Sequence, residues 1–175
     1  MKLAVASDHR GYEAKRRLLP TLRKMGHQVE DYGCDSAASC DYPDLAVPAV
    51  RAVLDGTADV AILMDGSGIG MSVVANKIRG VRAALAHDEI TARLAREHNH
   101  CNVLCLGTDL LSEDHLRQIV DIFLNTPFSG GRHQRRVAKV CQIEADEAVF
   151  PPKPAPHAPP PVERRKVARE NTPAK

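Results

Sequence analysis

The stretch of this sequence best suited to chemistry runs from Asp65 to Ser72, where one carboxylate precedes three closely spaced glycines. An apolar run at 60–64 indicates a buried strand before it, and residues 73–77 indicate a helix after it. A glycine loop presents several backbone N–H groups to one point, and a helix N-terminus adds unpaired donors and the positive end of its dipole. The stretch therefore predicts a site for a negatively charged oxygen, with Asp65 at its entrance.

The spacing of the glycines separates this loop from two common nucleotide-binding motifs. A dinucleotide-binding fingerprint follows the first strand with the spacing Gly-x-Gly-x-x-Gly, whereas Met71 stands here where the third glycine belongs, after the third strand. A P-loop needs Gly-Lys followed by Ser or Thr, which this stretch lacks. A tight turn without a ligand is the other interpretation, and the position between a buried strand and a helix favours the anion site.

Apolar runs alternate with helical periodicities along the chain, which predicts five strands separated by helices. The expected strands cover 3–6, 27–32, 60–64, 81–86 and 102–106, and the expected helices cover 12–25, 44–54, 73–77, 89–98, 113–125 and 132–141. This order specifies the α/β class, as a single doubly wound, Rossmann-like sheet of five parallel strands with helices on both faces. Pro20 lies inside the first expected helix and is expected to kink it.

Polar motifs follow four of the five expected strands. They are Asp8-His9, the loop at 65–71, His87-Asp88 and the segment 107–109. Connections in such a sheet are right-handed, and ligands bind at the carboxyl ends of its strands. We therefore expect these motifs to meet at one edge of the sheet and to form an active site there.

Composition limits the classes of protein to which the chain can belong. Its 175 residues suffice for one domain with a substantial core, and an aromatic fraction of 3% without Trp argues against a nucleic-acid binder that stacks bases. The start of the chain has no secretory signal, and no run is long enough to cross a membrane. With five cysteines, an odd number, the simplest account is a cytoplasmic protein with free thiols.

The composition changes near residue 150, which divides the chain into a domain at 1–149 and a tail at 150–175. The tail holds eight of the twelve prolines and a basic run at 163–166. Such a segment is typical of a disordered or polyproline-like appendage. The basic run could contact an acidic partner, but such runs are common and unspecific, so we expect a solvated tail.

An ordered set of short motifs identifies the chain, over about residues 1–144, as similar to the type B ribose-5-phosphate isomerases, which share a family with the galactose-6-phosphate isomerase subunits. The motifs are Ser7-Asp8-His9-Arg10-Gly11, Asp41-Tyr42-Pro43-Asp44, Gly66-Ser67-Gly68-Ile69-Gly70-Met71-Ser72, Ala75-Asn76-Lys77, Thr91-Ala92-Arg93, His98-Asn99, Asn102-Val103-Leu104 and Gly130-Gly131-Arg132-His133. The resemblance implies an aldose–ketose isomerase of a sugar phosphate, most simply ribose 5-phosphate. The reaction passes through a cis-enediolate and needs neither a metal nor a cofactor.

The resemblance also implies a base at position 65, where the ribose-phosphate members usually carry a cysteine. Asp65 is a sound replacement, because a carboxylate is ionised at neutral pH whereas a thiol must first lose a proton. Partial burial would improve a carboxylate as a base. The alternatives for Asp65 are a helix cap or a carboxylate that stabilises the loop.

Further roles follow from the resemblance, position by position. The Ser67 hydroxyl and the amides of Gly66 to Gly70 would stabilise the enediolate oxygen, although Ser67 could also bond only its own turn. His98 would open the sugar ring, since imidazole transfers protons in either direction near neutral pH; a histidine at a helix end can also be only a dipole partner. The residues expected to contact the substrate are Asp8, His9, Tyr42, Gly66, Gly68, Ile69, Gly70, Asn99, Arg132 and Arg136.

Arg132 and Arg136 are the expected phosphate ligands. They lie four residues apart and so share one helix face, and guanidinium groups suit phosphate. In the family this pair reaches into a neighbouring subunit's site, which implies a homodimer or a dimer of dimers with the active site at the interface. We expect the glycine loop to lie beside His98 and, across that interface, beside the two arginines.

Asp109 is a second departure from the family, many of whose members carry a substrate-binding arginine there. An Asp would repel a phosphate, so either the remaining cations bind it or the substrate differs; Asp109 could also cap a turn. Two further functions therefore stay open, an isomerase for another sugar or sugar-acid phosphate and a non-catalytic sugar-phosphate sensor. A metal site at His98, His100, Cys101 and Cys105 is a weaker hypothesis, because no zinc spacing matches.

Overall fold

The computed structural model describes residues 1–149 of the chain, with side chains to residue 146. Its elements follow in the order β1 (Lys2–Ser7), α1 (Tyr12–Lys24), β2 (Gln28–Asp31), α2 (Tyr42–Leu54), β3 (Val60–Asp65), α3 (Ile69–Ala75), β4 (Ala83–Leu85), α4 (Glu89–Asn99), β5 (Val103–Gly107), α5 (Glu113–Asn125) and α6 (Gly131–Val149). All five expected strands are present, so the predicted alternation is confirmed within shifts of a few residues. The expected tail, 150–175, lies outside the described residues.

The strands form one parallel sheet in the order β2-β1-β3-β5-β4. The register pairs Ser7 with Met64 and Asp65 with Gly107, so β1, β3 and β5 end at the same level of the sheet. The segments that follow these strands therefore lie side by side at the carboxyl edge. This arrangement confirms the predicted fold class and the predicted meeting of the motifs that follow these strands.

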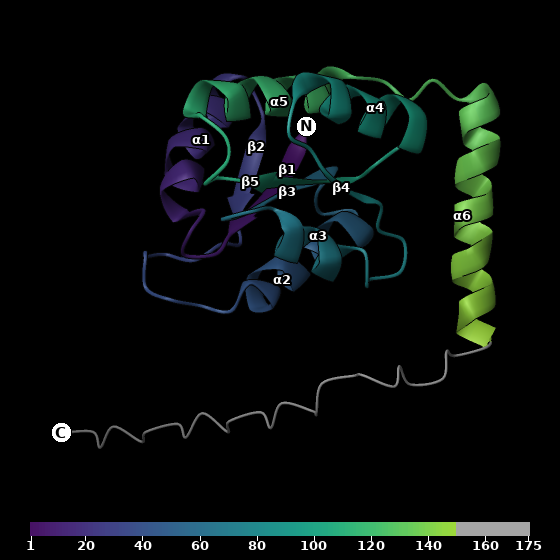
Figure 1. Cartoon of the computed structure of the whole chain (residues 1–175), viewed down its shortest axis with the longest axis horizontal. Coiled ribbons are helices and arrows are strands. Elements are labelled where there is room, and N and C mark those ends of the chain that lie inside the picture. Colours follow the sequence, from purple (N-terminus) through teal and green to yellow (C-terminus); the bar gives the residue numbers. More distant parts are fainter. Residues whose placement is uncertain (150–175) are drawn as a thin grey trace, which may run out of the picture.

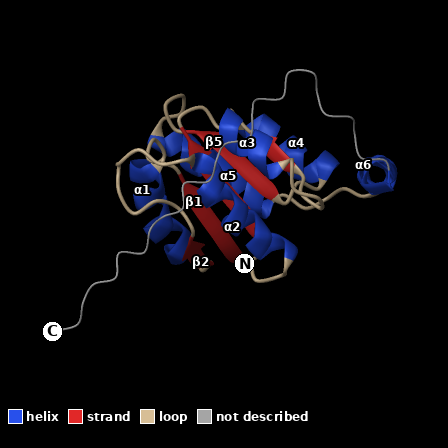
Figure 2. Cartoon of the chain, turned by 90° about the horizontal axis from the view of Figure 1, so that it is seen from below, coloured by secondary structure: helices blue, strands red, loops and turns tan. Residues whose placement is uncertain are grey.

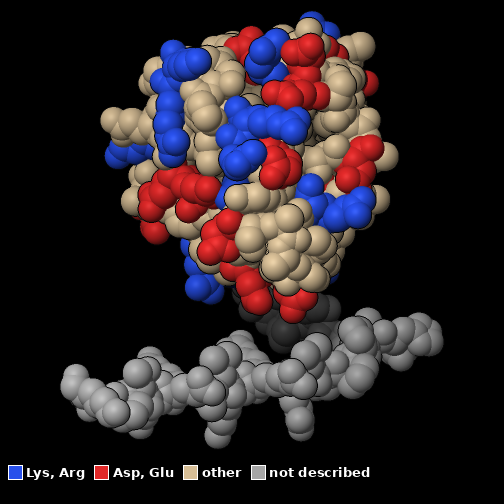
Figure 3. Space-filling model, turned by 90° about the vertical axis from the view of Figure 1, so that its left-hand side faces the viewer, with Lys and Arg blue, Asp and Glu red and all other residues tan. Residues whose placement is uncertain are grey.

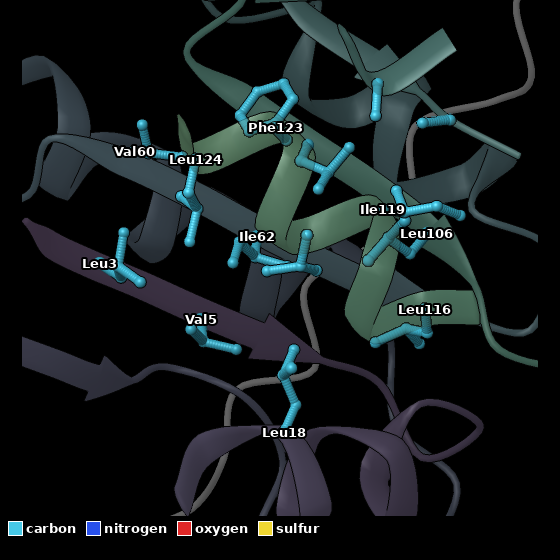
Figure 4. Packing of buried hydrophobic residues seen from close by; sticks show 14 of the residues in the cluster. Leu3, Val5, Leu18, Val60, Ile62, Leu106, Leu116, Ile119, Phe123 and Leu124 are labelled. Atoms are coloured by element: carbon cyan, nitrogen blue, oxygen red, sulfur yellow. The ribbon is translucent and has the colours of Figure 1, made fainter. Parts of the chain in front are cut away.

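Helices cover both faces of the sheet, as the sequence predicts. Helices α1, α4 and α5 pack on one face and α2 and α3 on the other (Figures 1 and 2). Figure 4 shows the first core, in which Leu116, Ile119 and Phe123 of α5 and Leu18 of α1 point toward the β1 and β3 side chains. The second core is built from smaller residues, because Ala46, Ala49 and Ala52 of α2 and Ala75 of α3 let these helices approach the strands closely.

Helix α1 contains Pro20 and covers nearly the predicted range. Helix α2 differs in detail from the prediction. Helix α2 begins at Tyr42, two residues earlier than expected, because Pro43 occupies its first turn, where the missing proline N–H costs no intrahelical bond.

Helix α6 stands away from the sheet and lies beside α4 rather than on either covered face (Figure 1). One hydrogen bond, from the Gly80 amide to Glu144 Oε1 at 2.8 Å, joins its second half to the segment before β4. Val140 and Ile143 of α6 are more than half exposed. Over the described residues, no helix combines the length and apolar character needed to cross a bilayer.

Candidate active site

The Asp65 carboxylate lies within the glycine loop, held by backbone amides. Its Oδ1 accepts the N–H groups of Ser67, at 2.8 Å, and of Gly68, and its Oδ2 accepts the N–H of Met71 at 3.0 Å. The residue is 5% exposed. The loop amides therefore bind the chain's own carboxylate, which matches the alternative of an Asp65 that stabilises the loop, and an external anion at this loop stays a prediction. The Asp65 side chain has a fixed orientation, and Oδ2 keeps a second lone pair for another partner.

Two amides of the loop are left for a bound oxygen. Ser67 Oγ accepts the Ile69 N–H at 3.2 Å, which matches the alternative of a serine that bonds its own turn. In the part of the chain that the structure describes, the Gly66 and Gly70 amides have no protein acceptor. The expected set of oxyanion donors thus narrows from five amides to these two, plus the Ser67 hydroxyl hydrogen.

Gly68 shows why the loop needs a glycine at its centre. Its φ is +78°, in the left-handed region, and it caps α3. A Cβ at this position would also lie 2.3 Å from Leu85 Cδ1 and 2.9 Å from the Leu106 carbonyl carbon. The loop is therefore pressed against the ends of β4 and β5, which any side chain at position 68 would prevent.

Asp8, His9 and Tyr42 lie around the same edge, as expected. Asp8 Oδ1 accepts the amides of Arg10, at 2.8 Å, and Gly11, at 3.1 Å, so this carboxylate mainly shapes the turn after β1. His9 Nδ1 lies 3.9 Å from Asp8 Oδ2 and accepts the Cys40 amide at 3.4 Å. The Tyr42 ring covers Gly70, because a Cβ on that glycine would lie 3.0 Å from Tyr42 Cζ.

One ion pair at this edge was missed by the sequence reasoning. Arg10 Nη2 and Nε donate to Asp109 Oδ2 at 2.5 and 3.2 Å, across 99 residues of sequence. The pair lies directly against Gly66, where a Cβ would come within 2.7 Å of that carboxylate oxygen. The negative charge of Asp109 beside the loop is therefore balanced by the Arg10 guanidinium. No local pattern could have revealed the pair, although both residues belong to motifs that follow neighbouring strands.

His98 does not lie beside the glycine loop, and this part of the expectation is wrong. Helix α4 begins after the carboxyl end of β4 and runs back along the sheet, so His98, near its last residue, lies toward the amino ends of the strands (Figure 1). There it lines a groove of about 570 Å³ between the α6 side chains and the start of β4. Asn99 and Arg136 line the same groove, and the loop does not.

The groove contains the expected site residues that do not lie at the glycine loop. The His98 ring stacks on His133 with centroids 4.1 Å apart and planes within 7°. Burial lowers the pKa of His133, and the charges of His98, Arg132 and Arg136 lower it further. Arg132 Nε lies 3.3 Å from His133 Nε2, and both arginines are exposed on α6. An imidazole pair flanked by two guanidinium groups suits a phosphorylated ligand with hydroxyl groups.

The structure does not bring the four residues of the metal hypothesis together. Cys105 is in the sheet core, where burial raises the pKa of its thiol far above the ordinary value. Burial also raises the pKa of Cys101 to about 11. His100 stacks on Phe128, with ring centroids 4.6 Å apart, and His98 stacks on His133. Both thiols therefore stay protonated at neutral pH and act as core residues.

Comparisons with known proteins find clear relatives over most of the described residues. A sequence profile described as Ribose/Galactose Isomerase matches residues 3–140. A Bacillus subtilis protein, provisionally named a sugar phosphate isomerase, is 43% identical over 145 residues, which cover 82% of this chain and 97% of that protein. The solved Clostridium thermocellum ribose-5-phosphate isomerase B superposes with a TM-score of 0.82 at 42% identity, covering 83% of this chain and 99% of that one.

A further solved structure is described with a bound sugar phosphate. It is the ribose-5-phosphate isomerase B of Mycoplasma genitalium with bound ribulose-5-phosphate, which superposes with a TM-score of 0.80 at 39% identity. The match covers 83% of this chain and 97% of that one.

Proposed function

The chain belongs to the Ribose/Galactose Isomerase family, and we propose that within it the protein interconverts ribose 5-phosphate and ribulose 5-phosphate. Its relatives establish it as a sugar-phosphate isomerase. The observation that carries the choice of reaction is the loop, where a fixed carboxylate lies beside two amides without an acceptor. The bound ribulose-5-phosphate of a relative that is 39% identical supports the choice of sugar.

The proposed reaction moves one proton between two neighbouring carbons. Asp65 removes the proton from C2 of the open-chain aldose, and the electron pair of that C–H bond forms the enediolate double bond. The negative oxygen that results is bound by the Gly66 and Gly70 amides and the Ser67 hydroxyl. The hydroxyl proton on O2 passes to O1, which lies on the same side of the cis-enediolate, and Asp65 returns the first proton to C1 as the C2 carbonyl forms, which gives the ketose. No metal or cofactor takes part, since preorganised N–H donors supply the charge stabilisation.

The sugar ring must open before this step, and His98 is the proposed proton donor and acceptor for it. Because His98 and Asn99 lie far from the loop of their own chain, a second copy of the chain must bring them to it. Arg132 and Arg136 would come with the same second copy and bind the phosphate. Each complete site therefore combines the loop of one chain with the groove of another.

The side of α6 that faces the groove supports this assembly. A groove of about 570 Å³ separates α6 from the body, and the apolar side chains of Val140 and Ile143 are more than half exposed. A helix that leaves its apolar residues uncovered is typical of a protein–protein interface. We propose a homodimer, either alone or within a dimer of dimers, whose two equivalent sites lie at the interface.

We also propose that the protein works in the cytoplasm, because its five cysteines are unpaired thiols and three of them are buried.

The test of this function is an isomerisation assay with a panel of tetrose, pentose and hexose phosphates, run in deuterium oxide. Conversion of ribose 5-phosphate, with deuterium incorporated at C1 of the product, is the expected result. Turnover of another sugar phosphate alone would replace the substrate but keep the reaction. Binding without exchange of any C–H proton would contradict the proposal and favour a sugar-phosphate sensor.

A further inference from the structure

The corner of the site beside Gly66 carries an ion pair that the mechanism above does not use. We propose that Arg10 is a substrate-binding residue that contacts the phosphate, and that Asp109 is the residue that positions it. This inference rests on the proposed function, because the phosphate it concerns is that of the sugar substrate. In this chain the phosphate-binding guanidinium would come from Arg10, in the turn after β1, and not from position 109, in the segment after β5.

The geometry holds the Arg10 guanidinium at the glycine loop. Asp109 Oδ2 accepts both Nη2, at 2.5 Å, and Nε, at 3.2 Å. A Cβ on Gly66 would lie 2.7 Å from that oxygen and 3.5 Å from Arg10 Nε. The pair therefore lies against the loop residue whose amide has no protein acceptor among the described residues.

The backbone of Arg10 is fixed from two sides. Its N–H donates to Asp8 Oδ1 at 2.8 Å, and its carbonyl accepts the Thr108 hydroxyl at 3.3 Å. The Thr108 amide donates to the Asp65 carbonyl at 2.9 Å, and its hydroxyl lies between the Arg10 and Asp65 carbonyl oxygens and shares its one hydrogen between them. The turn after β1, the end of β3 and the segment after β5 thus form one hydrogen-bonded unit that aims the Arg10 side chain.

The Arg10 guanidinium balances the negative charge of Asp109 and can still bind a phosphate. An isolated Asp109 would repel a phosphate dianion at the position where many family members have an arginine. Arg10 balances that charge. A guanidinium has five N–H groups and the ion pair uses two of them, so the others can donate to a phosphate. More than half of the Arg10 side chain is exposed, so those donors are accessible.

The surface around Arg10 has no basic patch that would attract a phosphate by its overall charge. On the side of the molecule where α1 lies, basic and acidic side chains are interspersed rather than gathered in one basic patch (Figure 3). Arg17 is paired with Glu113 and Arg16 with Glu13 on this side. An ordinary exposed pair of this kind contributes little to stability, so a large functional effect at Arg10 would distinguish it from its neighbours.

The experiment compares Arg10→Ala with Arg16→Ala, which removes an exposed, paired arginine of the neighbouring helix α1. The expected result is a rise of about ten-fold or more in KM for ribose 5-phosphate in Arg10→Ala, the usual cost of one charge-assisted hydrogen bond, with kcat nearly unchanged. Arg16→Ala should behave as the parent protein. Turnover of unphosphorylated ribose, measured at high enzyme concentration, should be equal in all three.

The double variant Arg10→Ala/Asp109→Arg provides the second arm. It removes the acidic group and returns an arginine to the position where the family carries one, so KM should recover to within about three-fold of the parent value, since a guanidinium again meets the phosphate. An unchanged KM in Arg10→Ala would overturn the inference. An equal loss for phosphorylated and unphosphorylated sugar would do so too, because it would indicate a structural role.

Direct binding separates this inference from the proposed function. Calorimetric titration with ribose 5-phosphate measures binding whether or not the sugar is isomerised. If the parent protein binds it without turnover, the proposed function fails, and weaker binding by Arg10→Ala still supports the role of Arg10. If the parent turns it over and Arg10→Ala binds it equally well, the function stands and the inference fails.

Discussion

The imidazole of His98 lies flat on that of His133, with ring centroids 4.1 Å apart. His98 is near the last residue of α4 and His133 lies in the first turn of α6, so the stack is a contact by which α6 is attached to the body. Two charged rings at this distance would repel each other, and Arg132 and Arg136 add two further positive charges. These contacts lower the pKa of His133, so the attachment of α6 favours a neutral His133.

This preference predicts a loss of stability in mild acid. The pKa values of His27, His100 and His133 are lowered from 6.5, in each case mainly by burial. Below pH 6.5 the unfolded chain therefore binds more protons than the folded chain, so the free energy of unfolding falls as pH falls toward 5. The carboxylates Asp55 and Asp88, whose pKa values are lowered from 3.8, titrate below this window.

Urea unfolding between pH 7.5 and 5 measures the effect. The variant His133→Gln, which cannot be protonated, should show a smaller fall over this range than the parent protein. A parallel fall in both proteins would show that His133 contributes nothing to the acid sensitivity.

Gly68→Ala should disrupt the site more than Gly26→Ala, although both glycines have positive φ. The φ angles are +78° and +88°, so the backbone strain is similar, on the order of 1 kcal/mol. At Gly68 the new methyl group would also collide with Leu85 and the β5 backbone, whereas nothing lies within 4 Å at Gly26. We expect Gly68→Ala to lose isomerase activity and several degrees of melting temperature, and Gly26→Ala to stay active. Comparable losses in the two variants would contradict this account of the loop.

Much of this arrangement could be predicted from the sequence because local patterns determine it. The buried run at 60–64 predicted β3, and the glycines after it predicted a loop whose amides bind an anion, which in this structure is the Asp65 carboxylate. The order of alternating elements predicted a parallel sheet, and with it the meeting of Asp8, Asp65 and Asp109 at one edge.

Two features were not predicted, for different reasons. The position of His98 follows from the parallel topology, because a residue just before β5 lies at the amino ends of the strands, whereas the resemblance that groups His98 with the loop does not say which chain supplies it. The Arg10–Asp109 pair joins residues 99 positions apart, and an acidic residue at 109 looked repulsive only while its partner was unknown. The pattern of residue types does not predict which distant side chain will form an ion pair with Asp109.

Asp65 has two roles in this account, and its variants should separate them. Asp65→Asn keeps an acceptor for the Ser67 and Gly68 amides but replaces Oδ2 with an amide that cannot accept the Met71 N–H. We expect isomerisation to fall at least 100-fold, since removal of a general base commonly costs that much. The fold should be retained, as judged by circular dichroism.

Asp65→Cys is the matched control, because it introduces the residue that the family usually carries there. Its activity should exceed that of Asp65→Ser and rise with pH toward about 8.5, as the thiol ionises. If Asp65→Asn keeps its activity, Asp65 only stabilises the loop and the base lies elsewhere.

The central claim is that each active site combines the loop of one chain with His98 of another, and subunit complementation tests it most directly. The inactive variants Asp65→Asn and His98→Asn are co-expressed with different affinity tags, and the isomerase activity of the mixed population is measured. A shared site predicts recovery to about a quarter of the parent activity, because half of the dimers are hybrids and each hybrid has one intact site. If the mixture, including purified hybrids, remains as inactive as either variant alone, both halves of the site belong to one chain and the claim is wrong.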